Sequence, residues 1–336
     1  MVETAELLSG FGGLTQNDLN NILDHVDKDD PEELLSYKSS MYVDMDGLNK
    51  YLQTKDNFTL LSLNIQSIHA KFEEFKIIID QLGLSGRKIN AICLQETWLD
   101  ENSDTNRLLI DGYNFISQPK SCSSHGGLAI YLRDDLSYSE ISMIPKSDLW
   151  ENQIINISGP SLTSTITICN VYRPPRNNDS NRVISNFLSE YSILVDQLSK
   201  SANECAIAGD FNINLLQLNE RDIFNEYFDL MVGCGFFPHI TLPTRFSKRS
   251  CTLIDQIFVK EKLNESSGTS VILFSNLSDH LPCISSIGTT LKPISTSKVI
   301  MKRKIDQNSL NNFYQGVSNM DLPSICHSNI DMTIMK

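Results

Sequence analysis

Gly209-Asp210-Phe211-Asn212-Ile213-Asn214 and Ser278-Asp279-His280-Leu281-Pro282 are the two stretches from which both the fold and the chemistry of this chain can be inferred. Each stands where an apolar, strand-like run meets a turn. An Asp-x-Asn at one strand end and an acidic residue beside a histidine at another can hold a metal ion, orient a water molecule and stabilise a phosphorane-like transition state. Together they predict a phosphoesterase centre.

Short apolar or alternating runs, bounded by polar turns, recur around these two stretches. They predict β-strands at residues 58–63, 89–94, 127–132, 153–157, 165–172, 205–208, 253–259 and 270–274. Three segments between them repeat apolar residues at helical spacing, from Ile68 to Leu82, from Phe187 to Leu198 and from Ile223 to Met231. Because strands and helices build one core, the pattern predicts an α/β or α+β fold.

Polar residues follow several of the predicted strands. Asn64, Glu96 and Tyr172 each stand where an apolar run ends, and loops at strand ends are where layered α/β folds place their chemistry. Taken singly, such residues also fit turns, helix starts or Asx-turns. Asp255 is different, because it lies inside an apolar run and needs a partner if buried, for which His280 is a natural choice.

Composition sets the outer limits. The chain has 336 residues, of which 40% are hydrophobic and 21% charged, enough for one large domain with flanks or two modest domains. No stretch approaches the roughly 18 apolar residues of a membrane helix, and residues 1–14 show no signal-peptide pattern. We therefore expect an intracellular protein, nuclear or cytoplasmic, that is neither secreted nor membrane-bound. The eight cysteines include no C-x2-C pair, which predicts buried, reduced thiols.

The net charge of −13 argues against nucleic-acid binding, because Lys and Arg make the phosphate contacts. Residues 1–57 hold twelve acidic and four basic residues, a net of −8, so the rest of the chain carries only −5. A carboxylate cluster that binds a metal would account for part of this remainder, and bound Mg²⁺ would reverse the local sign.

The chain is expected to have three parts. Residues 1–57 are expected to form an acidic N-terminal segment that is partly helical near Thr15 or disordered. The simplest interpretation is a mobile or loosely docked arm. Residues 58–288 form the domain with the alternating strands and helices. Residues 289–336, rich in Thr, Ser and Lys at their start, form a tail or linker with a weak helix around residues 310–313.

Seven motifs in this order resemble the endonuclease/exonuclease/phosphatase superfamily, and most closely the endonuclease domain of non-LTR (LINE-type) retrotransposons. The resemblance covers residues 58–288, and its motifs are Asn64-Ile65-Gln66-Ser67, Gln95-Glu96-Thr97-Trp98-Leu99, His125-Gly126-Gly127-Leu128-Ala129-Ile130-Tyr131, Asn170-Val171-Tyr172-Arg173-Pro174-Pro175, Gly209-Asp210-Phe211-Asn212, Leu253-Ile254-Asp255-Gln256-Ile257 and Ser278-Asp279-His280. The resemblance implies a four-layered sandwich of two mixed β-sheets flanked by helices.

The resemblance also implies roles for the strand-end residues. Glu96, with Asn64 and Asp279, would hold Mg²⁺, or alternatively Mn²⁺, since Mg²⁺ prefers a few hard oxygen ligands. Asp210 would orient and deprotonate the attacking water, with Asn212 holding the nucleophile or a phosphate oxygen. Tyr172 and His280, the latter oriented by Asp255, would donate to the phosphate. In-line attack would release a 3′-hydroxyl.

DNA is the expected partner, and residues 243–250 supply the contact. This predicted loop places Arg245, Lys248 and Arg249 around an aromatic residue, although an ordinary solvated turn would look the same. Thr244 and Arg245 border the active site in the family, and Arg173 adds a positive charge on the Tyr172 side. The five residues expected to bind substrate are therefore Thr244, Arg245, Lys248, Arg249 and Arg173.

Three functions remain open at this point. The first is a Mg²⁺-dependent endonuclease that nicks one DNA strand, acting as a monomer. The second is a phosphatase of the same superfamily that acts on a nucleotide or a lipid headgroup, since the fold serves both. The third is an inactive transposon remnant that still binds DNA, because the reverse-transcriptase part expected after such a domain is missing from the sequence.

Overall fold

The computed structural model describes residues 40–290, apart from 54–56, 85–88, 121–124, 177–179, 248–249 and 261–269, together with Gln315. The chain divides into two units, Met1–Pro293 and Ile294–Lys336, and every element below belongs to the first. The helices expected near Thr15 and around residues 310–313 lie outside the described residues.

Two mixed β-sheets form the centre of the first unit. The first sheet has the order β1-β14-β15-β2-β3-β5-β4, and the second has the order β10-β13-β9-β8-β7-β6. The strands of the first sheet are β1 (Ser40–Val43), β2 (Asn57–Asn64), β3 (Ala91–Gln95), β4 (Tyr113–Gln118), β5 (Leu128–Arg133), β14 (Ser270–Leu273) and β15 (Cys283–Thr290). Those of the second are β6 (Ser137–Ile141), β7 (Glu151–Ser158), β8 (Ile166–Tyr172), β9 (Glu204–Asp210), β10 (Phe236–Pro238) and β13 (Asp255–Lys260). A small antiparallel pair, β11 (Arg245–Ser247) and β12 (Ser250–Thr252), completes the strands.

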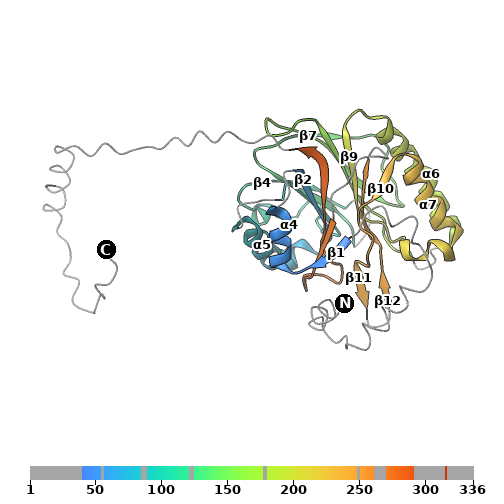
Figure 1. The fold of residues 1–336 in the computed structure, drawn as a ribbon, viewed down its shortest axis with the longest axis horizontal. Helices are drawn as coiled ribbons and strands as arrows, with labels where there is room; N and C mark the ends of the chain where they lie inside the picture. The colour runs from blue at the N-terminus through green and yellow to red at the C-terminus, as the bar shows by residue number, and fades with distance from the viewer. Residues whose placement is uncertain are drawn as a thin grey trace. The chain divides into compact units, whose positions relative to one another are not determined.

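Helices cover the outer face of each sheet (Figure 1). The helix α4 (Met45–Gln53) and the helix α5 (Ile68–Leu84) pack on the first sheet, and α6 (Asn181–Lys200) and α7 (Asp222–Gly233) pack on the second. Two short 3-10 helices, η1 (Asn106–Leu108) and η2 (Leu215–Glu220), lie in loops. The predicted four-layered sandwich of two mixed sheets flanked by helices is therefore confirmed.

Alternating burial along the central strands explains this layering. In β2, Phe58 and Leu60 belong to the hydrophobic cluster whose residues come from both sheets. Leu61 and Leu63 point to the other face and belong to the cluster that packs under α5. Strands buried on both faces read as nearly continuous apolar runs. This is why all eight predicted strands are present, with boundaries that differ by a few residues.

The N-terminal boundary predicted at residue 57 differs from the structure. The strand β1 pairs in parallel with β14, and the Ser40 hydroxyl donates to the carbonyl of His239. The helix α4 buries Leu48 and Leu52 against the first sheet. Residues 40–53 are thus part of the folded domain rather than of a loosely docked arm, and the last strand runs to Thr290 rather than ending at 288. A four-residue edge strand and a nine-residue helix give too weak a pattern to be read from sequence.

Two further sequence expectations concern membranes and cysteines. Within the described ranges, none of the helices combines the length and apolar character needed to span a membrane. The six described cysteines are free, and Cys93, Cys169, Cys205 and Cys283 are buried, as predicted, while Cys234 and Cys251 are partly exposed. Cys122 and Cys326 lie outside the described residues.

Candidate active site

Five of the predicted residues come from strand ends that meet at one edge of the two sheets. The strand β2 runs parallel to β3, and β8 runs parallel to β9, so the carboxyl ends of these pairs point the same way. Asn64, Tyr172 and Asp210 are the last residues of their strands, and Glu96 directly follows β3. Because β13 is antiparallel to β9, its first residue, Asp255, lies opposite Asp210 in the register.

Asn64 connects the two sheets at this edge. Its Nδ2 donates to Oε1 of Glu96 at 2.8 Å and to Oδ2 of Asp210 at 2.9 Å. The indole Nε1 of Trp98 donates to the other oxygen of Glu96 at 3.3 Å. One amide therefore places a carboxylate of the first sheet beside a carboxylate of the second.

A buried chain of hydrogen bonds holds His280. Its Nδ1 lies 2.9 Å from each carboxylate oxygen of Asp255, and the Thr244 hydroxyl donates to Oδ2 of Asp255 at 2.7 Å. The backbone N–H of Leu281 donates to the Thr244 carbonyl at 2.8 Å, which ties the histidine loop to the loop before β11. One ligand atom each of Asp210, Asp255 and His280 lies within 4.8 Å of the other two.

Burial and crowding of charge shift the pKa values at this edge. Burial, and then the negative charge of Asp255, raise the pKa of Asp210 to about 7. Burial alone would lower the pKa of His280, but the carboxylates of Asp255, Asp210 and Asp279 outweigh it and raise that pKa to about 9. Burial together with the charges of Glu96 and Asp210 raises the pKa of Tyr172 far above its usual value, so its phenol stays protonated.

These shifts predict an unusual pH dependence of stability in EDTA. His280 takes up its proton more tightly in the folded protein, so its stabilisation is complete below pH 6.5 and is lost as the pH rises through about 9. The free energy of unfolding should fall by on the order of 3 kcal/mol across this window, at about 1.4 kcal/mol per pKa unit. The raised pKa of Asp210 adds a slope of the same sign below pH 7.

Urea unfolding of the wild type and of His280→Gln between pH 6.5 and 9 measures this dependence. The variant should lose most of the slope, while His69→Gln, at an exposed position of α5, should keep it. Equal slopes in the wild type and His280→Gln would contradict the assignment.

Backbone strain is concentrated at the same strand ends. Among the described residues, the non-glycine residues with positive φ are Gln66, Ser67, Glu96, Trp98 and Asn212, and each stands directly or nearly directly after β2, β3 or β9. Positive φ is unfavourable for residues with a Cβ and persists where the surroundings enforce it, often at functional sites. Here the N–H groups of Thr97 and Trp98 donate to the carbonyls of Gly127 and Gly126, which fixes the turn that carries Glu96.

Arg173 and Asn212 support the loop after β9 from inside. The guanidinium of Arg173 donates to the carbonyls of Phe211 and Asn212 at 2.8 and 3.2 Å, and the Asn212 side chain donates to the Arg173 carbonyl at 2.8 Å. The Asn212 backbone N–H donates to Oδ1 of Asp210 at 3.0 Å. The arginine is only 1% exposed, and these hydrogen bonds use its guanidinium within the protein, so a contact between Arg173 and substrate stays a prediction that this burial does not favour.

The other expected substrate contacts divide into three cases. Thr244 is fully buried, with its hydroxyl on Asp255, so it positions the carboxylate and does not face a substrate. Arg245 is partly exposed, and its guanidinium donates to Asp279 from both Nε and Nη2 at 2.8 Å. This pairing holds Asp279 at the rim, where its other oxygen lies 3.8 Å from Nε2 of His280. Lys248 and Arg249 lie outside the described residues.

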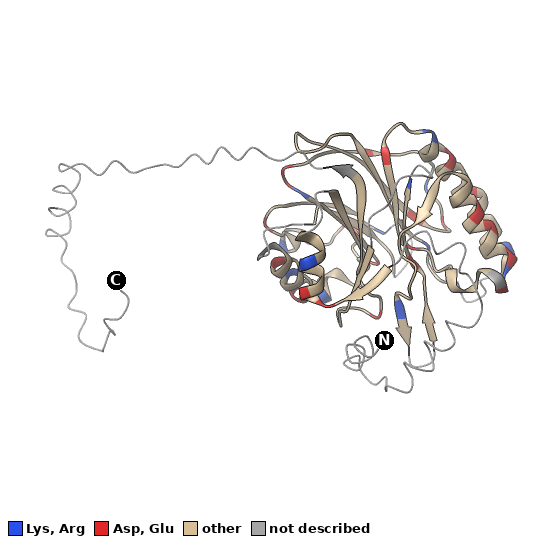
Figure 2. Ribbon diagram, viewed as in Figure 1, with Lys and Arg blue, Asp and Glu red and all other residues tan. Residues whose placement is uncertain are grey.

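Charge on the surface is distributed unevenly (Figure 2). Acidic residues without basic ones lie along α7, α6 carries residues of both signs, and β11 carries the basic residue Arg245. Arg245 is also the basic side chain joined to the histidine loop by an ion pair.

Three polar residues at the site were not predicted to function there. Glu151 lies opposite Tyr172 in the register of β7 and β8 and accepts from the Gly127 N–H at 2.7 Å. Gln95 donates to Asn170 at 2.6 Å, and Asn170 donates to the Leu94 and Ala129 carbonyls, so these two amides join the sheets below the site. Their sequence signal was an amide within an otherwise apolar run, which is costly unless it is paired inside the fold.

The donor set fits a divalent cation of the Mg²⁺ type. Glu96 and Asp210 each present a carboxylate oxygen to the Asn64 amide, and Asp255 adds a further negative charge beside Asp210. Burial, and then the charge of Asp255, raise the pKa of Asp210. Hard oxygen ligands and uncompensated negative charge are what Mg²⁺ requires, since it uses one or two carboxylates and retains water. The sulfur and multiple-histidine ligands of a structural zinc site are absent from this cluster.

Comparisons with known proteins agree with this geometry. The family model described as "Endonuclease/Exonuclease/phosphatase family" matches residues 35–280. The chain belongs to this family. Members of the endonuclease/exonuclease/phosphatase family are hydrolases that act on phosphoester bonds, generally with a divalent metal. A search of curated proteins finds no match.

Solved structures with the same fold include several endonuclease/exonuclease/phosphatase proteins. The AP endonuclease LMAP from Leishmania major has a TM-score of 0.57 and 15% identity, over 81% of this chain and 99% of that one. The endonuclease domain of TRAS1, a telomere-specific non-LTR retrotransposon, has a TM-score of 0.51 and 16% identity, over 69% and 98%. The 3′ phosphatase NExo from Neisseria, bound to a product DNA hairpin, has a TM-score of 0.50 and 14% identity, over 68% and 99%. At these identities the likeness establishes the fold.

Proposed function

We propose that this protein is a metal-dependent phosphodiesterase that nicks one strand of DNA, of the type found in non-LTR retrotransposons. The observation that carries the proposal is the buried group of Asp210, Asp255 and His280, joined through Asn64 to Glu96. The fold shared with the TRAS1 endonuclease domain supports the DNA substrate. The motifs Glu96-Thr97-Trp98-Leu99 and Tyr172-Arg173-Pro174-Pro175 support the retrotransposon type.

Asp210 is the proposed general base. Its pKa of about 7 suits a group that must take a proton from water near neutral pH. The Asn64 side chain and the Asn212 backbone N–H each donate to one of its oxygens, so the carboxylate is oriented before substrate binds. The Asn212 side chain donates to the Arg173 carbonyl, which fixes the amide for its proposed contact with the nucleophile or a phosphate oxygen.

His280 and Tyr172 are the proposed donors to the phosphate. With Asp255 on Nδ1 and a pKa of about 9, His280 is protonated at neutral pH and presents Nε2 as a donor. Tyr172 keeps its phenolic proton because its pKa is raised. Two preorganised donors in a buried site stabilise the charge that develops as water attacks phosphorus and the bond to the 3′ oxygen breaks.

Glu96 and Asn64 would hold the divalent cation, with Asp279 at the rim. A bound cation would polarise a phosphate oxygen and neutralise part of the charge of the transition state. Arg245, fixed by Asp279 at the rim of the site, would bind a neighbouring phosphate of the strand. The protein is proposed to act as a monomer on DNA.

Nicking of supercoiled plasmid tests the proposal. Purified protein with Mg²⁺ should convert supercoiled plasmid to the open-circular form, EDTA should abolish the conversion, and Asp210→Ala combined with His280→Ala should define the background. Wild-type nicking no higher than that of the double variant, with Mg²⁺ or Mn²⁺, would refute the endonuclease.

A phosphatase is the second candidate, favoured by the shared fold with the 3′ phosphatase NExo. The same general base and phosphate donors would hydrolyse a phosphomonoester. Release of inorganic phosphate from a nucleotide or lipid headgroup without plasmid nicking would select this function. Salt-dependent retention on DNA without turnover in any metal would instead select an inactive remnant.

A further inference from the structure

The turn that carries Glu96 is strained, and the backbone facing it is built from two glycines. Glu96 and Trp98 have φ values of +49° and +59°, in the left-handed region that residues with a Cβ rarely adopt. Such a conformation persists only where the surroundings enforce it. The facing residues, Gly126 and Gly127, have φ values of +118° and +84°, which favour glycine. Because two successive glycines make a flexible backbone, they can hold the turn only if they are themselves fixed.

One peptide group connects this turn to the second sheet. The carbonyl of Gly126 accepts from the backbone N–H of Trp98 at 2.8 Å. The N–H of Gly127, in the same peptide group, donates to Oε2 of Glu151 at 2.7 Å. The C=O and N–H of a planar trans peptide point in opposite directions, so this group lies between Trp98, after β3, and Glu151, the first residue of β7. A hydrogen bond to a carboxylate is strong, and it polarises the peptide so that the carbonyl accepts more strongly.

The same path continues to the carboxylate of Glu96. The indole Nε1 of Trp98 donates to Oε2 of Glu96 at 3.3 Å, so Trp98 is held through its backbone and orients the carboxylate with its side chain. The two segments are also tightly packed, because a Cβ built on Gly127 would lie 2.7 Å from Oγ1 of Thr97. A change at Glu151 can therefore reach the proposed metal ligand through successive hydrogen bonds.

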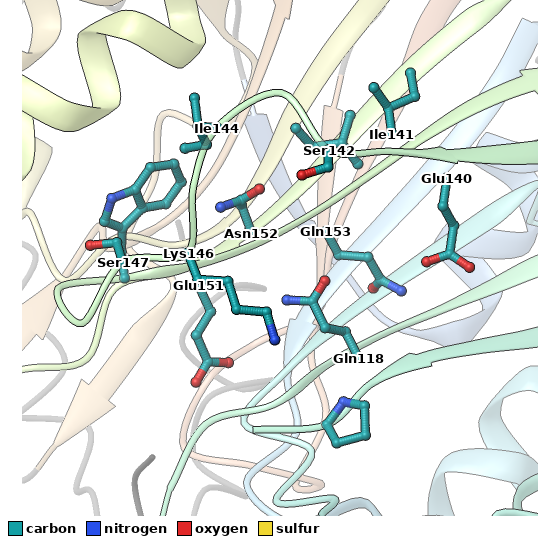
Figure 3. Close-up of a pocket in the computed structure, with 13 residues that line it drawn as sticks. Gln118, Glu140, Ile141, Ser142, Ile144, Lys146, Ser147, Glu151, Asn152 and Gln153 are labelled. Carbon is teal, nitrogen blue, oxygen red and sulfur yellow. The ribbon is translucent and has the colours of Figure 1, made fainter. Parts of the chain in front are cut away.

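Glu151 is one of two carboxylates that line a pocket of about 290 Å³, and the other is Glu140 (Figure 3). Glu140 lies on β6 and is exposed, whereas Glu151 is partly buried and uses one oxygen on the Gly127 N–H. Removing a carboxylate from water is costly unless it is hydrogen-bonded, so the bond to Gly127 stabilises Glu151 at this place. The two residues give a matched pair: one carboxylate bonded to the glycine peptide, and one in the same pocket on an exposed strand.

We propose that Glu151 is a positioning residue for the divalent cation. Through the Gly126-Gly127 peptide and Trp98, it holds Glu96 in the orientation in which this carboxylate binds the metal. The inference rests on the proposed metal-dependent function, with Glu96 as a ligand. Groups that orient a metal ligand without touching the metal contribute about ten- to hundredfold to metal affinity. Because the hydrogen bond and not the charge carries the effect, a neutral acceptor of the same length should replace Glu151, and a shorter carboxylate should not.

Binding of Mn²⁺ alone, measured from the electron paramagnetic resonance signal of the free ion, tests the inference without catalysis. Glu151→Met should weaken binding by about tenfold or more, because the Gly127 N–H loses its acceptor. Glu151→Gln keeps an acceptor at the same reach and should stay within about threefold of the wild type. Glu151→Asp keeps the charge but is one methylene shorter, and should weaken binding as Glu151→Met does. Glu140→Met is the matched control and should bind like the wild type.

Hydrogen exchange in EDTA gives a second measurement that needs no metal. The backbone amides of Gly127 and Trp98 should exchange faster in Glu151→Met than in the wild type, because both belong to the chain of hydrogen bonds that starts at Glu151. Glu151→Gln should restore most of the protection. Glu140→Met should leave both amides unchanged.

The comparison of variants decides the inference. Mn²⁺ binding by Glu151→Met equal to that of the wild type would overturn it, even if the wild type nicks plasmid. Equal weakening in Glu151→Gln and Glu151→Met would also overturn it, since the charge alone would then act. A wild type that binds no Mn²⁺ would overturn both the inference and the proposed metal site. Mn²⁺ binding that depends on Glu151, without plasmid nicking, would support the inference and refute the proposed endonuclease. If Glu151→Met does not fold, Glu151→Gln against Glu151→Asp gives the decision.

Discussion

Asp210→Asn is expected to reduce plasmid nicking by roughly 10²–10⁴-fold, the usual contribution of a general base. The amide has nearly the same shape as the carboxylate but cannot take a proton from water. The Asn64 side chain and the Asn212 N–H donate to different oxygens of Asp210. Because asparagine keeps only one of these oxygens, one of the two contacts is lost.

Stability distinguishes lost chemistry from lost structure in this variant. Removing one of two buried carboxylates that repel each other should leave the midpoint of urea unfolding in EDTA unchanged or raise it. The matched control is Asp229→Asn, an exposed position on α7, which should nick like the wild type. A folded Asp210→Asn variant with wild-type nicking would show that another group takes the proton.

Gly209→Ala is expected to destabilise the domain by more than about 4 kcal/mol, among the largest effects of a single substitution. Gly209 has a φ of +153°, and a Cβ built on it would lie 1.8 Å from the carbonyl oxygen of Val171. That oxygen belongs to β8, the parallel neighbour of β9, so the clash is with a sheet backbone rather than with a mobile side chain. The residue that follows is Asp210, so any accommodation would also displace the proposed base.

Urea unfolding followed by circular dichroism measures this loss. Gly233→Ala is the matched control, because a Cβ there meets nothing within 4 Å. Alanine near the end of α7 should be neutral or stabilise by about 0.5–1 kcal/mol through the lower entropy of the unfolded chain. A Gly209→Ala variant as stable as the wild type would show that β8 and β9 can separate without cost.

The sequence predicted the strands that are buried on both faces and the helices with a continuous apolar side. Segments 58–63 and 165–172 were recognisable because nearly every residue in them is apolar, which only a doubly covered strand explains. The edge strand β6, Ser137–Ile141, was not predicted, because its residues are exposed or only partly buried and show no alternation of apolar and polar residues. The strand β15 was not predicted either, because serine and threonine occupy positions that are apolar in other strands.

Candidate site residues could be named from sequence because polar groups at the ends of apolar runs are rare and conspicuous. The direction in which these side chains point, and what they contact, could not be predicted from sequence. Arg173 and Thr244 were predicted from sequence to contact DNA at the surface. In the structure both are buried, and each forms a hydrogen bond with the residue that it supports. Asp279 was grouped with the metal ligands, while the structure pairs it with Arg245. Burial depends on what packs above a residue, which local sequence does not encode.

What the sequence by itself determined is the set of strands and helices, the four-layered fold implied by its motifs, and the chemical types available at the strand ends. Only the tertiary structure decided that Asn64 bridges Glu96 and Asp210, that Thr244 and Asp255 hold His280, and that the Gly126-Gly127 peptide connects Trp98 to Glu151. The physical reason is the range of the forces. Hydrophobic periodicity acts along a segment, whereas hydrogen bonds and pKa shifts depend on atoms brought within a few ångströms from distant parts of the chain.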